Sequence, residues 1–221
     1  PKILVVNGLD REHTKYDEIL NQAKERFGKN VFPMQLPVNA GPNFDQVIDV
    51  LRSELITYKT DGSGSYKEEP LPENLVPDVN NLHSELIEYV AESDDSLLEK
   101  YFEKGNLSEE EMRGGIHQAI QNQIFIPMFC VSSELNIGVA RLCDFISKYG
   151  SSPDDRKTVN AINDKDEDMK ISLDGDNTVI QIFKTISESH IGEFSLFRVY
   201  SGVVKAGDDL FNANRNNSER M

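Results

Sequence analysis

The sequence has few cysteines, a shortage of basic residues and no long apolar run. Its 221 residues include two cysteines, Cys130 and Cys143, and this number and spacing exclude a disulfide framework or a zinc site of the usual kind. No segment approaches the ~18 consecutive apolar residues that a membrane-spanning helix needs. We therefore expect a cytoplasmic protein that does not bind membranes.

Basic residues are outnumbered by acidic ones, 23 against 38, which gives a formal net charge of -15. Such a field repels the phosphates of DNA unless a local basic face overrides it, and no basic run is present. The acidity is concentrated, because 14 acidic and 2 basic residues lie between Glu68 and Glu111. A solvated helical face is the simplest explanation of such a segment.

The chain begins with a strand, a loop and a helix. The β-branched run KILVVN, residues 2–7, is typical of the middle of a parallel sheet, buried on both faces. Apolar residues then recur at helical spacing from Tyr16 to Phe27, and Gly28 supplies the stop. Because the chain enters this strand at Pro1, we expect it to be a piece of a longer protein.

A second unit of the same kind lies at residues 124–150. The apolar run IFIPMFCVSS is followed by a predicted helix that begins near Val139 and ends before Gly150. In open α/β sheets the loops at the carboxyl ends of parallel strands share one rim. The sequence therefore predicts that NGLD, residues 7–10, and SSELN, residues 132–136, lie on that rim.

The residues between and after these units do not continue the pattern. We predict an inserted acidic α+β subdomain at 31–123, with a strand–helix–strand over 47–59 and a capping box from Ser108 to Glu111. Residues 151–175 are predicted to be a linker. Period-two alternation at 176–221 indicates antiparallel strands that begin a sheet or barrel, and we expect this domain to be truncated.

The NGLD loop has the chemistry for reading a guanine base. An aspartate carboxylate accepts two parallel hydrogen bonds, which matches the N1–H and 2-amino group of guanine, whereas adenine presents the reverse pattern. The plainer alternative is that Asn7, Gly8 and Asp10 form a turn and cap the next helix. The tetrapeptide alone favours the turn, and a serine-rich turn on the same rim, with backbone N–H groups for O6, shifts the balance only somewhat toward the base site.

Several segments together resemble translation elongation factor G, in order and spacing over nearly all of the chain. They are VVNGLDRE, FPMQLPVNAG, ESDDSLLEKYFEKGNLSEEEMRGGI, IPMFCVSSELNIGV and GEFSLFRVYSGVVKAGDDLFNA. The resemblance implies part of a P-loop GTPase-type parallel sheet at 1–30 and 124–150, with the family's extra subdomain inserted. It also implies a partial antiparallel β-barrel, domain II, at 176–221.

The resemblance also assigns site residues. Residues 7–10 correspond to the fourth guanine-nucleotide motif, usually Asn-Lys-x-Asp, so that Asn7, Gly8, Leu9 and Asp10 would bind GTP or GDP. Asp10 would bind N1–H and the 2-amino group, and Asn7 would hold O6 and the loop. In the fifth motif, Ser132 and the backbone of Ser133 would complete the base pocket.

Two departures from the family pattern weaken this site. Gly8 and Leu135 both stand where lysine is common, and we expect guanine-nucleotide binding to lose about 1–2 kcal/mol for a missing stacked or charge-assisted contact. A divergent, non-hydrolysing or specialised ribosome-binding paralog, for example one acting in ribosome recycling, is the alternative that these positions keep open.

The phosphate half of the site has no counterpart in this sequence. No GxxxxGK[ST] loop occurs, and no segment supplies Mg²⁺ ligands or a water-positioning residue, so we expect this piece to have no catalytic residues and no activity alone. Its four histidines have no metal-site spacing, and the segment DGDN, residues 174–177, is not followed by the glycine and the distant glutamate that an EF-hand calcium loop needs.

The intact parent would, by resemblance, use GTP hydrolysis to promote ribosomal translocation, with Mg²⁺ as its metal. Its partners would be the ribosome, including the stalk protein through the acidic insert, and ribosomal RNA through the barrel.

Overall fold

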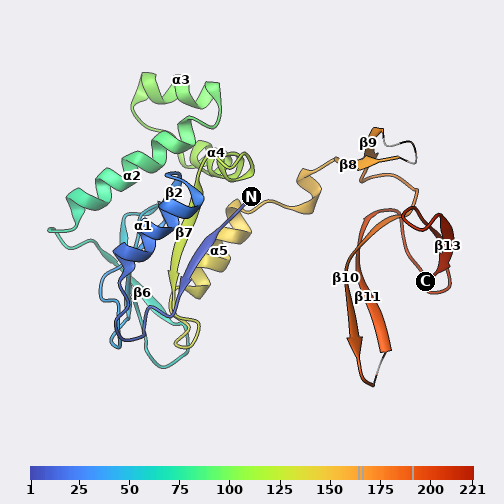
Figure 1. The fold of residues 1–221 in the computed structure, drawn as a ribbon. Helices are drawn as coiled ribbons and strands as arrows, with labels where there is room; N and C mark the ends of the chain where they lie inside the picture. The colour runs from blue at the N-terminus through green and yellow to red at the C-terminus, as the bar shows by residue number, and fades with distance from the viewer. Residues whose placement is uncertain (164, 166, 191) are drawn as a thin grey trace. The chain divides into compact units, whose positions relative to one another are not determined.

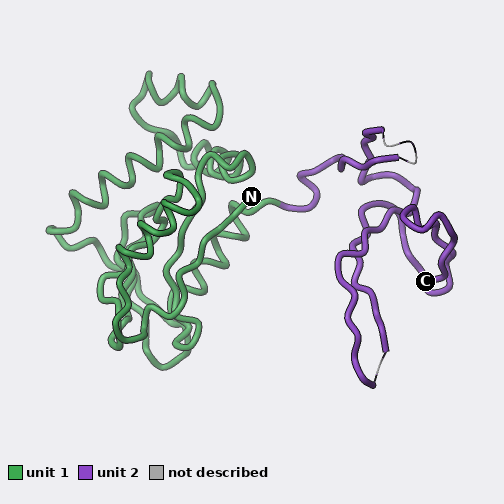
Figure 2. The backbone as a smooth tube through the Cα atoms, in the orientation of Figure 1, with its two compact units in different colours: residues 1–151 green, residues 152–221 purple. Residues whose placement is uncertain are grey.

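The chain folds into two compact units, residues 1–151 and 152–221 (Figure 2). The computed structural model describes residues 1–163, 165, 167–190 and 192–221. The described elements combine helices with one parallel and several antiparallel sheets, so the mixed α/β character expected from the sequence is confirmed.

A parallel sheet forms the centre of residues 1–151, all of which are described. Its strands lie in the order β1 (Leu4–Asn7), β7 (Ile126–Val131), β2 (Val31–Pro33) (Figure 1). Every residue of β7 is buried. Met128 packs into the core on one face and Phe129 into the core on the other, as the period-two alternation of a strand requires.

Within this chain, the prediction that the first strand lies in the middle of the sheet, buried on both faces, is wrong. Among the described strands β1 pairs only with β7, and its residues alternate between half-buried and exposed. Leu4 and Val6 pack against one core, whereas the side chain of Val5 is 45% exposed. The central place belongs to β7, because β7 has a strand on each side and apolar cover on each face.

Two helices cover opposite faces of this sheet, and both agree with the sequence pattern. Helix α1 (Tyr16–Phe27) ends at Gly28, whose N–H donates to the carbonyl of Lys24 at 3.0 Å. It packs its apolar stripe on the face that contains Met128. Helix α5 (Val139–Tyr149) covers the other face, with the rings of Phe145 and Phe129 4.7 Å apart.

An antiparallel sheet packs beside the parallel one. Its strands lie in sequence order, β3 (Gln35–Pro37), β4 (Gln46–Asp49), β5 (Glu54–Tyr58) and β6 (Tyr66–Pro70). The predicted helix within 47–59 is absent, since β4 and β5 are joined by a tight turn. The Asp49 carboxylate accepts from the N–H of Arg52 at 3.1 Å, and such a local bond favours a turn over a helix.

Three helices follow, and they carry most of the acidic segment. They are α2 (Val76–Ala91), α3 (Asp95–Lys104) and α4 (Glu109–Gln121). Leu86 of α2 and Ile116 of α4 join the core that also contains Phe129. Residues 31–33, which we predicted to lie in the insert, pair in parallel with β7. The insert therefore shares its core with the sheet.

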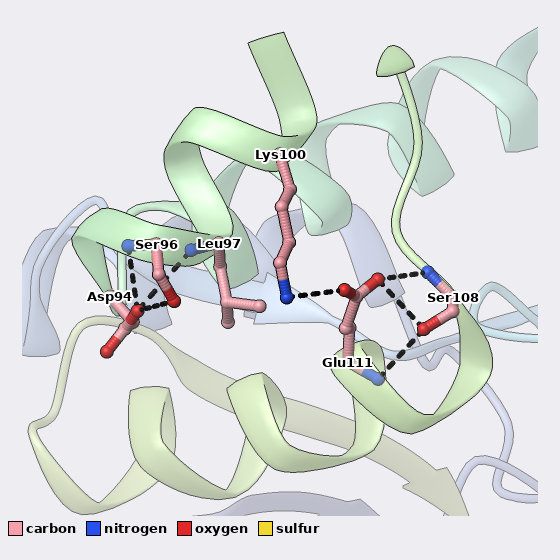
Figure 3. Close-up of polar contacts among 6 residues, drawn as sticks. All are labelled: Asp94, Ser96, Leu97, Lys100, Ser108 and Glu111. Carbon is pink, nitrogen blue, oxygen red and sulfur yellow. Dashed lines mark hydrogen bonds and ion pairs between the residues drawn. The ribbon is translucent and has the colours of Figure 1, made fainter. Parts of the chain in front are cut away.

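Side-chain caps fix where α3 and α4 begin (Figure 3). Asp94 accepts from the N–H of Ser96 at 2.8 Å. Ser108 and Glu111 form the capping box that the sequence predicts, with Ser108 N donating to Glu111 Oε2 at 2.9 Å and Glu111 N donating to Ser108 Oγ at 3.3 Å. Lys100 Nζ lies 2.8 Å from Glu111 Oε1, so one carboxylate joins the two helices.

Replacing Glu111 with glutamine is expected to remove a pH-dependent part of the stability. The ion pair with Lys100 and the bonds from Ser108 lower the pKa of Glu111 from 4.5 to about 2. A pKa lowered by folding adds stability that is present above pH 4.5 and is lost as the pH falls toward 2. In urea unfolding, E111Q should be less stable than wild type at pH 6, and the gap should narrow at pH 3.

The matched control is Glu110→Gln, which removes the same charge from an exposed position in the same turn. It should show no gap that varies with pH in this way. A gap for E111Q that stays constant from pH 6 to pH 3 would contradict the role given to Glu111.

The second unit, residues 152–221, is built from short antiparallel pairs. Its described strands pair as β8–β9, β10–β11 and β12–β13, with no closed barrel among them. Their bounds are Thr158–Ile162, Asp168–Ser172, Val179–Glu188, Gly192–Ser201, Asp209–Asn212 and Asn217–Arg220. The predicted linker, 151–175, contains a short 3-10 helix (Pro153–Asp155) and the mostly exposed β8–β9 pair. In the part of the chain that the structure describes, none of the helices is long and apolar enough to cross a membrane.

Candidate functional site

The two loops that the sequence places on one rim lie side by side. Strands β1 and β7 are parallel neighbours in a register that sets Asn7 opposite Val131, so both chains leave the sheet at the same edge. The N–H of Gly8 donates to the carbonyl of Val131 at 3.1 Å. The loops 7–10 and 132–137 therefore share one edge of the sheet.

The side chain of Asn7 joins these loops directly. Its Oδ1 accepts from the N–H of Ser133 at 2.9 Å, and its Nδ2 donates to the hydroxyl of Ser133 at 3.0 Å. The same Oδ1 accepts from the N–H of Gly8 at 2.9 Å. Asn7 thus acts as a clasp between the loops, and the backbone N–H of Ser133 is engaged within the protein.

The side chains of Ser132 and Leu9 are buried beneath the two loops. Ser132 is fully buried, its hydroxyl accepts from the N–H of Leu135 at 3.2 Å, and its backbone exchanges two bonds with Ile137. The side chain of Leu9 is also fully buried, in the core that contains Phe44. The structure therefore brings Asn7 and Ser133 to the rim, and it places the side chains of Leu9 and Ser132 beneath it.

Asp10 has acceptor capacity that the protein does not use. The residue is half-buried, and its Oδ1 is shielded from solvent without a hydrogen-bond partner among the described residues. Leaving a buried polar atom unpaired costs about 1–3 kcal/mol. A donor brought to this carboxylate would recover that energy, and this is the property expected of a binding residue.

Gly8 adopts a backbone conformation that favours glycine, and Arg11 lies against it. The φ angle of Gly8 is +82°, and a Cβ added there would lie 3.3 Å from Nε and 3.4 Å from Cδ of Arg11. An open hollow beside this turn is lined by Asn7, Gly8 and Arg11 together with residues from the start of α1. Sequence reasoning assigned no role to Arg11. The signal available in the sequence was a cation directly after Asp10, the last residue of the NGLD loop.

Part of the insert also contacts the rim. Asn136 Nδ2 donates to the carbonyl of Gly62 at 3.4 Å, so the turn between β5 and β6 touches the 132–137 loop. This turn includes DGSGS, residues 61–65, which the sequence marks as a turn or mobile loop.

Beneath the rim, a thiol and a phenol are buried and held neutral. Burial raises the pKa of Cys130 and of Tyr16. The Cys130 thiol and the Tyr16 hydroxyl both donate to the backbone carbonyl of Gln35, at 3.3 and 3.1 Å. A neutral, buried thiol is a poor nucleophile. Among the described residues, no group of three or more His, Cys, Asp or Glu side chains could hold a metal ion.

Comparison with known proteins identifies a shared fold. No family model matches the sequence. The chain is similar to a protein from Thermus thermophilus that was solved by crystallography, with 26% sequence identity and a TM-score of 0.73. The similarity covers 96% of this chain and 29% of that protein. The chain thus spans less than a third of the Thermus protein's length and is similar to it in fold over nearly all of its own.

Proposed function

We propose that this chain is part of a translational GTPase resembling elongation factor G, and that it forms the guanine-base side of the GTP/GDP site. The observation that carries the proposal is the Asn7–Ser133 clasp, which joins the two loops beside an aspartate with unused acceptor capacity. Contacts to the phosphates and to Mg²⁺ belong to other parts of the parent protein. There, GTP hydrolysis would promote ribosomal translocation.

Guanine offers the hydrogen-bond donors that the carboxylate of Asp10 can accept. The N1–H and 2-amino group of the base are parallel donors, and they match the two oxygens of one carboxylate. Oδ1 is closed to solvent, so in this proposal the carboxylate turns toward the rim as the base enters. Adenine has no donor at N1, and it would leave the carboxylate unpaired.

Exposed apolar side chains in both units support the proposal that this chain is part of a larger protein. In the proposal, further strands of a P-loop GTPase-type sheet pair with β1, covering Val5. A completed β-barrel second domain would bury the exposed apolar side chains of residues 176–221, such as Phe183 and Phe211, which are 64% and 65% exposed. Apolar exposure on this scale is typical of surfaces that contact other protein. The ribosome, its stalk protein at the acidic insert and ribosomal RNA at the barrel are the proposed partners.

A second candidate is a non-hydrolysing or specialised ribosome-binding paralog, for example in ribosome recycling, with a degraded base site. Two observations favour it. Leu135 packs its half-buried side chain against the core, whereas a lysine there would reach over a base. Gly8 has no side chain to cover the ring.

Binding of free nucleosides tests the proposal without the phosphate half of the site. The ¹⁵N-labelled chain is titrated with guanosine, and adenosine serves as the matched control. We expect guanosine at millimolar concentration to shift the amide signals of Gly8, Asp10 and Ser133, and adenosine to leave them in place. If neither nucleoside moves these signals, or if both move them equally, the guanine-site proposal is overturned. The first of these results favours the degraded paralog.

A further inference from the structure

The side chain of Arg11 lies against the position where a side chain at residue 8 would begin. The Cγ, Cδ and Nε atoms of Arg11 lie 3.3 to 3.8 Å from the position of a Cβ on Gly8. The aliphatic stem and the start of the guanidinium therefore run along the backbone of the loop. The chain lacks a side chain at position 8, and it has an arginine stem beside that position.

The local fold holds Arg11 at this position. Its N–H donates to the carbonyl of Gly8 at 3.1 Å, which closes the turn. The hydroxyl of Thr14 donates to the carbonyl of Arg11 at 2.8 Å. The backbone on both sides of Arg11 is thus fixed, and the side chain leaves the turn toward the hollow that it lines with Asn7 and Gly8.

The charge of Arg11 is available to a ligand. The residue is exposed, and it forms no ion pair among the described residues. Lys15 lines the same hollow, but its Nζ lies 2.7 Å from Glu18. Two side chains of the Lys and Arg type line this hollow, and among the described residues Arg11 is the one whose charge is not paired with a carboxylate.

We propose that Arg11 is the residue that covers the face of the purine, supplying the contact that Gly8 cannot make. This inference rests on the proposed guanine site. A guanidinium is planar and weakly hydrated, and it stacks on aromatic rings better than an ammonium does. With the base edge held by Asp10, one ring face lies along the turn of residues 8–11, beside the Arg11 stem.

A lysine at position 8 is expected to add little affinity while Arg11 is present. A residue with a side chain is strained at a φ of +82°, and its Cβ would press on Arg11. The Gly8→Lys variant should gain less than about 2-fold in guanosine affinity while Arg11 is present, because both side chains compete for one place.

A set of variants tests this role by guanosine titration of the full chain, followed through the Asp10 and Ser133 amides. Arg11→Ala should weaken binding about 3- to 5-fold, and Arg11→Lys should weaken it less. Arg26→Ala removes the same charge from an exposed position in the last turn of α1, and it should bind like wild type. Adding Gly8→Lys to Arg11→Ala should restore most of the lost affinity, which a merely structural role for Arg11 would not produce.

The outcomes separate the role of Arg11 from the proposed guanine site. If wild type binds guanosine and Arg11→Ala binds equally well, the role of Arg11 is overturned and the proposed function stands. If Arg11→Ala and Arg26→Ala weaken binding equally, the effect is one of overall charge, and the role is again overturned. If wild type shows no response to guanosine, the proposed function fails, and the role of Arg11 fails with it.

Discussion

Replacing Asp10 with asparagine is expected to exchange guanosine for xanthosine as the preferred nucleoside. Asparagine accepts at Oδ1 but donates at Nδ2, so it meets the 2-amino group of guanine donor to donor. Xanthine has a carbonyl at that position, which accepts from Nδ2. Losing one charge-assisted bond and leaving its partner unpaired corresponds to about 2–3 kcal/mol, or roughly 30- to 150-fold weaker guanosine binding.

The measurement is a pair of titrations, guanosine and xanthosine, on wild type and on D10N, followed through the Gly8 and Ser133 amides. Asp17→Asn is the matched control, since it makes the same change at an exposed position in the first turn of α1. D10N should leave the clasp intact, because Asn7 and Ser133 bond to each other without Asp10. A D10N variant that still prefers guanosine would show that Asp10 does not read the base.

The features that the sequence predicts well are those with local causes. Helix α1 ends at Gly28 and α4 begins at the Ser108–Glu111 box, because the residues at a terminus satisfy its unpaired backbone groups themselves. The adjacency of the loops at Asn7 and Ser133 follows from a rule of similar generality, since parallel strands end at one rim.

The features that the sequence does not predict depend on distant neighbours. KILVVN is apolar enough for a central strand, but burial on both faces needs partners, and β7 has them on both sides. The turn in the 47–59 segment has a local bond from Arg52 N to Asp49, but it is also held from outside, since the N–H of Val50 donates to the carbonyl of Met34 at 3.0 Å. The sequence offers no local signal for that bond.

In the candidate site, too, the sequence predicts some features, and others depend on the folded structure. The motif predicts that Asn7 and Asp10 meet the serine loop, but it cannot tell that Ser132 is fully buried, since serine is usually exposed. The place of Arg11 follows from the positive φ of Gly8 and from the closed turn around it. These are properties of the folded backbone that residue spacing does not encode.

Replacing Gly138 with alanine is expected to be among the most destabilising single changes to the 1–151 unit. Gly138 ends the 132–137 loop and precedes α5, with a φ of +77°. A Cβ there would lie 2.3 Å from the carbonyl oxygen of Cys130 and 3.3 Å from Cγ1 of Val131. The carbonyl belongs to β7, which is buried along its whole length and has little room to move. The strained φ and the clash together correspond to about 3 kcal/mol or more.

Gly105→Ala separates these two causes. Gly105 follows α3 with a similar φ of +71°, and no described atom outside its own neighbours lies within 4 Å of an added Cβ. Its replacement should therefore cost about 1–2 kcal/mol, from backbone strain alone. Urea unfolding followed by circular dichroism gives both values, and the difference between them measures the contact with β7.

The close approach of Gly138 to β7 also holds the 132–137 loop of the candidate site in place. If Gly138→Ala shifts the 132–137 loop away from β7, the Asn7–Ser133 clasp should loosen, and guanosine affinity should fall together with stability. Gly105→Ala should leave that affinity unchanged, because α3 lies outside the rim. Equal stability losses in the two variants would mean that the loop yields without cost. A loop so loosely held could not keep Ser133 in place for the clasp, and the base site would lose its structural basis.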